Sequence, residues 1–383
     1  MQMHELMLSG TIVYGDEFEE KEGYVVINQG KIKEIGDEKI DATVNGIIIP
    51  SFVNAHTHIG DSVAKEPDFM PIEKLVGPGG FKHKILAETP YDILVASMKD
   101  TIGDIFATGT QLFADFREGG VFGVSALKDA FRSTGGDAKS HMKIFGRPAA
   151  SSGTGTGIGT ETDEIHTLFG FVDGIGMSSV ADHPQDELTL LAEAAKREGK
   201  IFALHAGERN TADIKGAIEL EPDFIVHLIK ALPRDFRQMR DKNISAVVCI
   251  RSNLVTGVGL PPVSQMLESG LTVGVGTDNV MLNSTDIFSE MEFISKIFRL
   301  DAREVLKMCT LNSARVLKED QSIGSIEEGK KANLLVIRTD TPNMRHVRNP
   351  IRGVVRRATR NDLAAIIYEG EVVYRHGTSS SLH

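Results

Sequence analysis

Short apolar runs recur along the middle of the chain and alternate with longer amphipathic segments. A short apolar run between turn residues is typical of a buried strand, and an apolar stripe at helical spacing is typical of a helix. Their alternation predicts βα units around a parallel sheet. The candidate strands are Ile47–Val53, Thr110–Phe116, His141–Phe145, Gly170–Ile175, Ile201–His205, Phe224–His227, Ser245–Ile250 and Thr272–Gly276.

Amphipathic segments fill most of the intervals between these strands. The expected helices are Tyr91–Thr108, Val121–Ser133, Asp186–Glu198, Pro262–Ser269, Thr285–Arg299 and Asp301–Leu317. Eight strand–helix repeats in about 270 residues match a (β/α)8 TIM barrel better than a doubly wound sheet of five or six strands. Catalytic groups of such a barrel lie at the carboxyl ends of its strands, so reactive side chains are expected where each apolar run stops.

Both ends of the chain carry short β-like runs outside this alternation. They are Gly10–Tyr14, Gly23–Asn28, Lys31–Ile35, Ala332–Ile337, Ala364–Tyr368 and Glu371–Tyr374. Because isolated hairpins are only marginally stable, we expect the two sets to complete one sheet or sandwich. The predicted organisation is a terminal β-sandwich from residues 1–48 and 322–383, and a barrel over residues 49–321.

Composition and charge narrow the classes of protein. With 41% hydrophobic and 25% charged residues, the chain is typical of a globular protein. Its net charge of -11 argues against a nucleic-acid partner, since phosphate neutralisation needs a basic surface. The Arg-rich run from Arg345 to Arg360 is expected to be a solvated face.

Cysteine usage and the amino terminus predict a cytoplasmic protein. Cys249 and Cys309 cannot make a disulfide framework, and both are expected to be small core residues. The first residues lack a basic region followed by an apolar stretch, and no apolar run is long enough to span a membrane. No membrane partner is therefore expected.

Several candidate strands stop at residues that bind metals. His56 and His58 follow the first run, and because they are two residues apart they can face one side. Later runs stop at His205, His227 and Asp278. Imidazoles and a carboxylate at one barrel mouth suit one divalent metal ion, zinc first, with iron or manganese as alternatives. Such an ion lowers the pKa of water from 15.7 to about 7, which a lone side chain cannot do.

Two carboxylates that follow strands have less specific signals. Acidic residues after a strand also cap the next helix. For Glu208, three residues after His205, a functional role is favoured, and for Asp115 a structural one.

At this point the sequence resembles the metal-dependent amidohydrolase superfamily, in particular its cytosine-deaminase-like and chlorohydrolase-like branch. The resemblance covers nearly the whole chain and rests on Pro50-Ser-Phe-Val-Asn-Ala-His-Thr-His58, His205-Ala-Gly-Glu208, His227, Arg251-Ser-Asn253 and Gly276-Thr-Asp278. It implies a mononuclear site whose metal ligands are His56, His58, His205 and Asp278.

The resemblance also implies the catalytic roles. Asp278 would take a proton from the activated water, Glu208 would move protons between water, ring nitrogen and leaving group, and His227 would hydrogen-bond the water or substrate. A binuclear relative would need a lysine or an acid at the end of strand four. That strand has no lysine, and Asp173 could in principle bridge two ions.

Substrate contacts are predicted from the loops. The segment after strand one lacks the Leu-Arg-Gly stretch of the family's nucleoside-type deaminases, and Lys82-His83 is expected to contact substrate instead. Arg147 follows strand three and could contact an anion, and the Gly/Ser/Thr-rich run Ser151–Thr160 is expected to be a flexible loop. Arg251 beside Asn253 could grip a carbonyl or carboxylate.

The leading prediction is a metal-dependent hydrolase that releases ammonia from a nitrogen heterocycle of purine, pyrimidine or pterin type. The alternatives are a cyclic amidohydrolase of hydantoin or imidazolone type, an aryl-halide hydrolase and, more remotely, a catalytically silent barrel subunit. The expected partner is a small-molecule substrate, and a homo-oligomer remains open.

Overall fold

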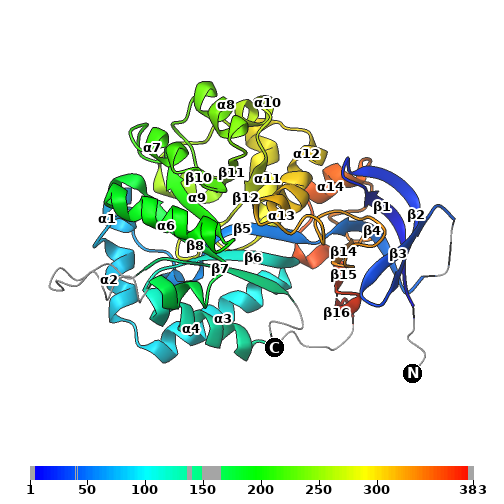
Figure 1. Cartoon of the computed structure of the whole chain (residues 1–383). Coiled ribbons are helices and arrows are strands. Elements are labelled where there is room, and N and C mark those ends of the chain that lie inside the picture. The colour runs from blue at the N-terminus through cyan, green and yellow to red at the C-terminus, as the bar shows by residue number, and fades with distance from the viewer. Residues whose placement is uncertain (1–4, 39, 41, 136–139, 149–164, 378–383) are drawn as a thin grey trace.

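The computed structural model describes residues 5–38, 40, 42–135, 140–148 and 165–377. The predicted loop Ser151–Thr160 lies outside this part of the chain. The described residues form two β-sheets, and helices surround one of them (Figure 1).

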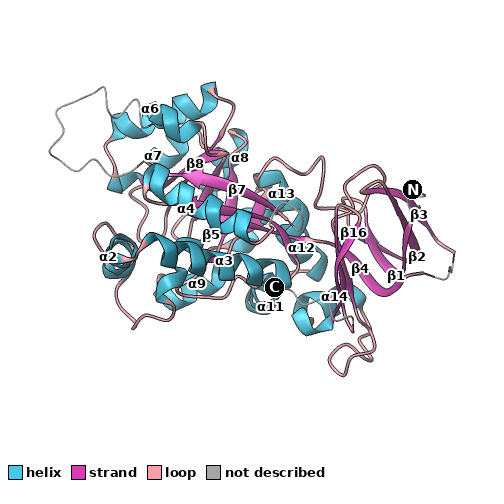
Figure 2. Cartoon of the chain, turned by 90° about the horizontal axis from the view of Figure 1, so that it is seen from below, coloured by secondary structure: helices cyan, strands magenta, loops and turns pink. Residues whose placement is uncertain are grey.

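One sheet joins the two ends of the chain. It has seven strands in the order β16-β15-β14-β4-β1-β2-β3 and lies to one side of the helical part (Figure 2). Its strands are β1 (Leu6–Tyr14), β2 (Glu19–Asn28), β3 (Lys31–Gly36), β4 (Val44–Pro50), β14 (Leu334–Ile337), β15 (Leu363–Tyr368) and β16 (Glu371–Arg375). The structure thus confirms β-structure built from both termini, in the form of one seven-stranded sheet.

The second sheet has nine parallel strands in the order β12-β11-β10-β9-β8-β7-β6-β5-β13. They are β5 (Phe52–His58), β6 (Thr110–Arg117), β7 (His141–Gly146), β8 (Gly174–Ser179), β9 (Ile201–Ala206), β10 (Phe224–His227), β11 (Ser245–Val248), β12 (Val273–Val275) and β13 (Asp278–Asn279). β13 follows β12 directly and pairs with β5, Asp278 opposite Thr57. The sheet therefore curls until its last strand reaches its first, in agreement with a TIM-like barrel.

Helices follow most of the parallel strands and cover the outside of the sheet (Figure 2). They are η1 (Ile59–Ala64), α1 (Ile72–Leu75), α2 (Phe81–Glu88), α3 (Tyr91–Ala107), α4 (Gly120–Ser133), η3 (Val180–Asp182), α6 (Gln185–Arg197), α7 (Ile214–Glu219), α8 (Pro233–Asp241), α9 (Ile250–Thr256), α10 (Val263–Glu268), α11 (Ile287–Phe298), α12 (Ala302–Lys307), η4 (Met308–Asn312), α13 (Ser313–Val316), α14 (Pro350–Arg356) and η5 (Arg360–Asp362). None of the helices in the described ranges is long and apolar enough to cross a membrane.

The predicted first barrel strand, Ile47–Val53, is divided between the two sheets. Its first four residues belong to β4, where Ile48 pairs with both Ile12 and Val336. The transfer occurs at one peptide: Ser51 N–H donates to Asn333 O of the terminal region, and the next N–H donates to Gly109 O beside the barrel. The apolar run looked like one strand because both halves are buried, one in each sheet.

The fourth barrel strand begins and ends later in the chain than the sequence predicted. The structure has β8 at Gly174–Ser179 and not at Gly170–Ile175, so Asp173 lies just before the strand. Its Oδ2 accepts a hydrogen bond from Ile144 N–H at 2.9 Å. The suggestion that Asp173 could bridge two metal ions is therefore wrong, since its carboxylate lies at the opposite end of the sheet from the histidines.

Aromatic side chains fill the inside of the curled sheet. Phe116 stacks on Phe145 with centroids 5.0 Å apart, and Phe224 meets Phe145 edge to face at 5.6 Å. All three are at most 1% exposed, so each adds roughly 1.5–3 kcal/mol of burial free energy. The ring centroids of His56 and Phe116 are 4.3 Å apart, so this aromatic layer packs directly against the histidines.

Candidate active site

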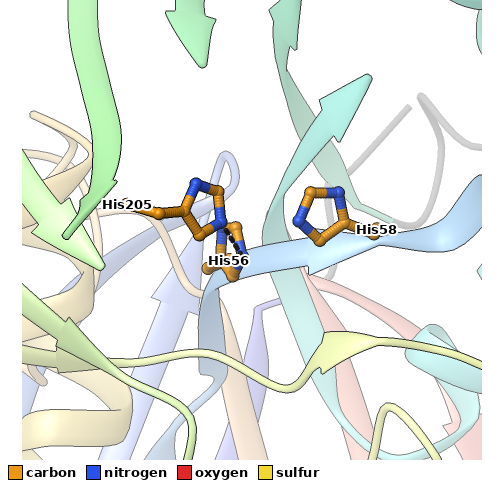
Figure 3. Close-up of side chains that lie close together, drawn as sticks. All are labelled: His56, His58 and His205. Carbon is orange, nitrogen blue, oxygen red and sulfur yellow. Dashed lines mark hydrogen bonds between the residues drawn. The ribbon is translucent and has the colours of Figure 1, made fainter. Parts of the chain in front are cut away.

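Three histidines from two strands meet at the carboxyl end of the sheet. His56 and His58 come from β5, and His205 comes from β9 (Figure 3). One ring nitrogen of each lies within 4.8 Å of the others. The Nε2 atoms of His56 and His205 are only 3.2 Å apart, as the dashed line in Figure 3 marks.

Backbone carbonyls set the orientation of two of these rings. Nδ1 of His58 lies 3.0 Å from Phe116 O, and Nδ1 of His205 lies 2.7 Å from Met177 O. A carbonyl can only accept, so Nδ1 carries the proton and Nε2 keeps its lone pair for a metal. Burial lowers the pKa of His58 to about 3 and that of His205 well below its usual value, which keeps both rings neutral.

Asp278 completes the cluster from β13. Its Oδ1 lies 3.3 Å from His56 Nε2 and 3.6 Å from His58 Nε2, and its Oδ2 accepts from Ser252 Oγ at 2.5 Å. Burial would raise the pKa of Asp278, but the hydrogen bond from His56 and the neighbouring imidazoles lower it well below its usual range. The group is therefore a carboxylate, the form that binds a cation.

These four side chains fit a divalent metal ion. His56 Nε2 lies 3.2 Å from His205 Nε2 and 3.3 Å from Asp278 Oδ1, so these atoms converge on one point where they could share a cation. Nδ1 of His56 is buried without a hydrogen-bond partner in the described structure, so no contact opposes use of its Nε2 as a ligand. Three imidazole nitrogens and one carboxylate oxygen form a ligand set typical of zinc.

A glycine permits this close approach of the last strand to the first. Gly276 lies between β12 and β13, and a Cβ there would be 2.6 Å from His56 Cβ and 2.8 Å from His56 O. Two residues later Asp278 has φ 61°, in the left-handed region that non-glycine residues rarely adopt. Such strain persists where the surroundings over-determine it, and it clusters at functional sites.

Glu208 and His227 lie beside the histidine cluster and Asp278. Glu208 Oε1 is 3.6 Å from His227 Nε2, while His227 Nδ1 lies 3.1 Å from Asn253 Oδ1. The backbone of His227 is also left-handed, at φ 76°. Burial raises the pKa of Glu208 despite the opposing effect of His227, so this carboxyl holds its proton to higher pH than an exposed glutamate.

One cavity contains most of the predicted functional residues. Its lining includes His58, His205, Glu208, His227, Asp278, His83 and Arg147. Arg147 donates from Nε to Gly176 O at 3.3 Å, and no carboxylate in the described chain lies within ion-pair distance of it. The structure therefore brings His83 and Arg147 to the same cavity as the candidate metal ligands.

The other two predicted substrate contacts are not among the described residues that line this cavity. Arg251 pairs with Glu290 at 2.8 Å and donates to Ser284 O at 2.6 Å, which ties it to the start of α11. Asn253 reaches the site only through its hydrogen bond to His227. Asp115 has the structural role predicted for it, because its Oδ1 accepts from Ile59 N–H at 2.6 Å.

The sequence analysis did not identify Glu118, and it considered Lys82 only as a substrate contact. Glu118 follows β6, and its Oε1 lies 3.0 Å from His58 Nδ1 and 2.6 Å from Lys82 Nζ. Its position one residue after a strand was a usable signal, since the same rule identified the histidines. The contact of Lys82 with it spans 36 residues of chain and left no local pattern.

Comparisons with known proteins agree with this geometry. Residues 47–373 match the model of the amidohydrolase family. An uncharacterized protein of Methanocaldococcus jannaschii is 34% identical over 94% of this chain and 96% of its own length. A 5-methylthioadenosine/S-adenosylhomocysteine deaminase of Thermoanaerobacter pseudethanolicus is 26% identical over 92% of this chain and 87% of its own.

A solved structure shows the same fold. An adenosine deaminase of Xanthomonas campestris with bound zinc superposes with a TM-score of 0.82 at 16% identity, over 96% of this chain and 92% of its own. The family match covers most of the chain, including every residue of the histidine cluster. This chain belongs to the amidohydrolase family.

Proposed function

We propose that the protein is a metal-dependent hydrolase that deaminates a nitrogen heterocycle of purine, pyrimidine or pterin type. The observation that carries the proposal is geometric: the histidine cluster with Asp278 lies beside Glu208 and His227 at one cavity. There the pKa of Asp278 is lowered and that of Glu208 is raised. Groups whose environments move their pKa values apart are suited to act as base and acid in one reaction. The deaminases among the relatives and solved structures support the same reaction.

His56, His58, His205 and Asp278 would hold the ion, with zinc the first candidate and iron or manganese the alternatives. The bound ion would supply Lewis-acid activation of water at neutral pH. The single histidine cluster in the described residues favours one ion rather than two.

The remaining residues divide the proton transfers. Asp278 would accept the proton of the attacking water, and Glu208 would donate one to the ring nitrogen next to the attacked carbon. His227, fixed by Asn253, keeps Nε2 toward the cavity and would hydrogen-bond the incoming oxygen. Asp278 would then pass the proton it accepted to the amino group, and Glu208 would take the proton of the added hydroxyl. The carbon–nitrogen bond would break and ammonia would leave, with both carboxyl groups back in their starting states.

His83 and Arg147 would contact the substrate. Arg147 is a cation without a carboxylate partner in the described structure, and it suits a carbonyl or anionic group on the heterocycle. Arg251 could act only indirectly, through the position of α9, and Asn253 would act through His227.

Ammonia release from a panel of purines, pyrimidines, pterins and hydantoins tests the proposal. We expect ammonia from at least one aromatic amine, in proportion to the bound metal. A hydantoin opened without ammonia, or a triazine that loses chloride, would replace the deaminase with a cyclic amidohydrolase or an aryl-halide hydrolase. Protein without stoichiometric metal would favour a silent barrel subunit.

The proposal also covers the domain organisation, the location and the partners of the protein. We propose a closed (β/α)8 barrel over residues 49–321 with a β-sandwich from residues 1–48 and 322–383. A cytoplasmic location, a small-molecule substrate and no nucleic-acid or membrane partner go with it. The oligomeric state, which size-exclusion chromatography with light scattering would measure, remains open.

A further inference from the structure

The carboxylate of Glu118 lies directly behind one metal ligand. Its Oε1 is 3.0 Å from Nδ1 of His58, the nitrogen that faces away from the histidine cluster. Nδ1 of His58 meets the carbonyl of Phe116, as Nδ1 of His205 meets that of Met177, and His56 Nδ1 is unpartnered in the described structure. Among these three described histidines, only His58 has a carboxylate beside its Nδ1 as well.

Two cations hold Glu118 in place. Lys82 Nζ lies 2.6 Å from Oε1, and an Arg117 guanidinium nitrogen lies 2.7 Å from Oε2. Only 4% of the Lys82 side chain and 11% of the Glu118 side chain are exposed. A buried ion pair of this kind adds little to the stability of the fold, because desolvation offsets much of the attraction. We therefore look for a functional role of the pair.

The charge on Glu118 is secured by the same neighbours. Ion pairs with Lys82 Nζ at 2.6 Å and Arg117 at 2.7 Å favour the ionised carboxylate of Glu118. Nδ1 of His58 is hydrogen-bonded to Phe116 O at 3.0 Å, and the Glu118 carboxylate lies at the same distance from it as a second, charged neighbour. A carboxylate beside Nδ1–H supports the tautomer with Nε2 free and makes Nε2 a stronger metal ligand.

We propose that Glu118 is a positioning residue for the metal ligand His58, and that Lys82 and Arg117 hold Glu118 in its place. The inference rests on the proposed metal site and goes beyond it, because it gives a metal-tuning role to residues outside the ligand set. It also gives the segment after β5, which carries Lys82 on α2, a part in metal binding.

The zinc dissociation constant of Glu118→Gln, measured by competition with a chromophoric chelator, tests this proposal. We expect zinc binding to weaken by about 10–100-fold, since residues that orient metal ligands have effects of that size. With cobalt in place of zinc, the visible spectrum should shift, because the field at the metal changes. Glu319→Gln is the matched control: it breaks the Lys143–Glu319 pair of 2.6 Å, away from the histidines, and should leave both measurements unchanged.

Lys82→Met keeps the test usable if Glu118→Gln does not fold. It leaves the Glu118 carboxylate but removes its nearest cation, and we expect a smaller loss of zinc affinity, on the order of several-fold. Folded Glu118→Gln or Lys82→Met protein with wild-type zinc affinity and cobalt spectrum would overturn the proposal. Because no substrate is used, this result is independent of whether the enzyme is a deaminase.

Discussion

The two ends of the curled sheet use carboxylates in different ways. At the amino ends of β8 and β10, Asp173 accepts from Ile144 N–H at 2.9 Å and Asp223 accepts from Phe202 N–H at 2.8 Å. At the carboxyl ends, Glu208 and Asp278 face imidazoles at 3.3–3.6 Å. Of these four carboxylates, the amino-end pair accepts from backbone N–H groups of a neighbouring strand, and the carboxyl-end pair faces imidazoles.

The two ends of the sheet also differ in what these carboxylates can do for the protein. The amino-end carboxylates join neighbouring strands through ordinary hydrogen bonds, which stabilise a fold by about 1 kcal/mol each. At the carboxyl end, His227 and Asp278 adopt left-handed backbone conformations, and desolvation raises the pKa of the half-buried Glu208. This separation agrees with the general division of such barrels into a stability face and a catalytic face.

The largest expected effect comes from Glu208→Gln. The amide keeps the size of the side chain but cannot donate and accept a proton in turn, so turnover should fall by about 10²–10⁴-fold. Zinc content should not change, because Glu208 is not one of the proposed ligands. Ammonia release and metal analysis on the same preparation measure both quantities.

Asp173→Asn is the matched control from the opposite end of the sheet. It should retain activity per folded molecule and lower the free energy of unfolding by about 0.5–1.5 kcal/mol. If Asp173→Asn abolished turnover while Glu208→Gln kept it, the division between the two ends would be wrong.

An intermediate effect is expected from Gly276→Ala. The added Cβ would lie 2.6 Å from His56 Cβ, so β5 and β13 must separate, and Asp278 moves away from the histidines. A misplacement near 1 Å can cost about 10²-fold in rate. Turnover and zinc affinity should therefore fall together.

Gly103→Ala provides the control for this substitution. Gly103 lies within α3, and a Cβ there meets nothing within 4 Å. Alanine should stabilise the helix slightly and leave turnover unchanged. Wild-type zinc affinity in Gly276→Ala would show that the close approach of the strands is not needed to place Asp278.

Part of the site could be predicted from the sequence, because reactive side chains were expected where each apolar run stops. Phe224–His227 was predicted with the bounds that the structure shows, because its apolar run stops at a residue that cannot remain in an apolar core. The same rule placed His205 and Asp278 at the carboxyl ends. It works because a parallel sheet brings all such ends to one edge, so local patterns add up to a site.

Two kinds of feature could not be predicted in this way. The division at Ser51 leaves no trace in hydrophobicity, since both flanking strands are buried, and it depends on partners Asn333 and Gly109 far along the chain. The Lys82–Glu118 pair is a contact between a loop helix and a strand end. The packing of α2 against η1, the helix that follows β5, brings these charges together.

The smallest effect concerns stability and not turnover. Asp61 follows β5 at the catalytic end, and burial raises its pKa to about 7, against the opposing effects of Lys82 and Asn279. A folded-state pKa above the unfolded value favours the protonated native state, so this contribution is present at acidic pH and lost as the pH rises through 7.

Asp61→Asn removes the titration. The free energy of unfolding of wild type relative to Asp61→Asn should therefore decrease between pH 4 and 8, by at most about 4 kcal/mol. Urea unfolding of both proteins across this pH range, at one zinc concentration, measures the difference in free energy of unfolding. A difference that stays constant or increases with pH would show that the pKa of Asp61 is not raised in the folded protein.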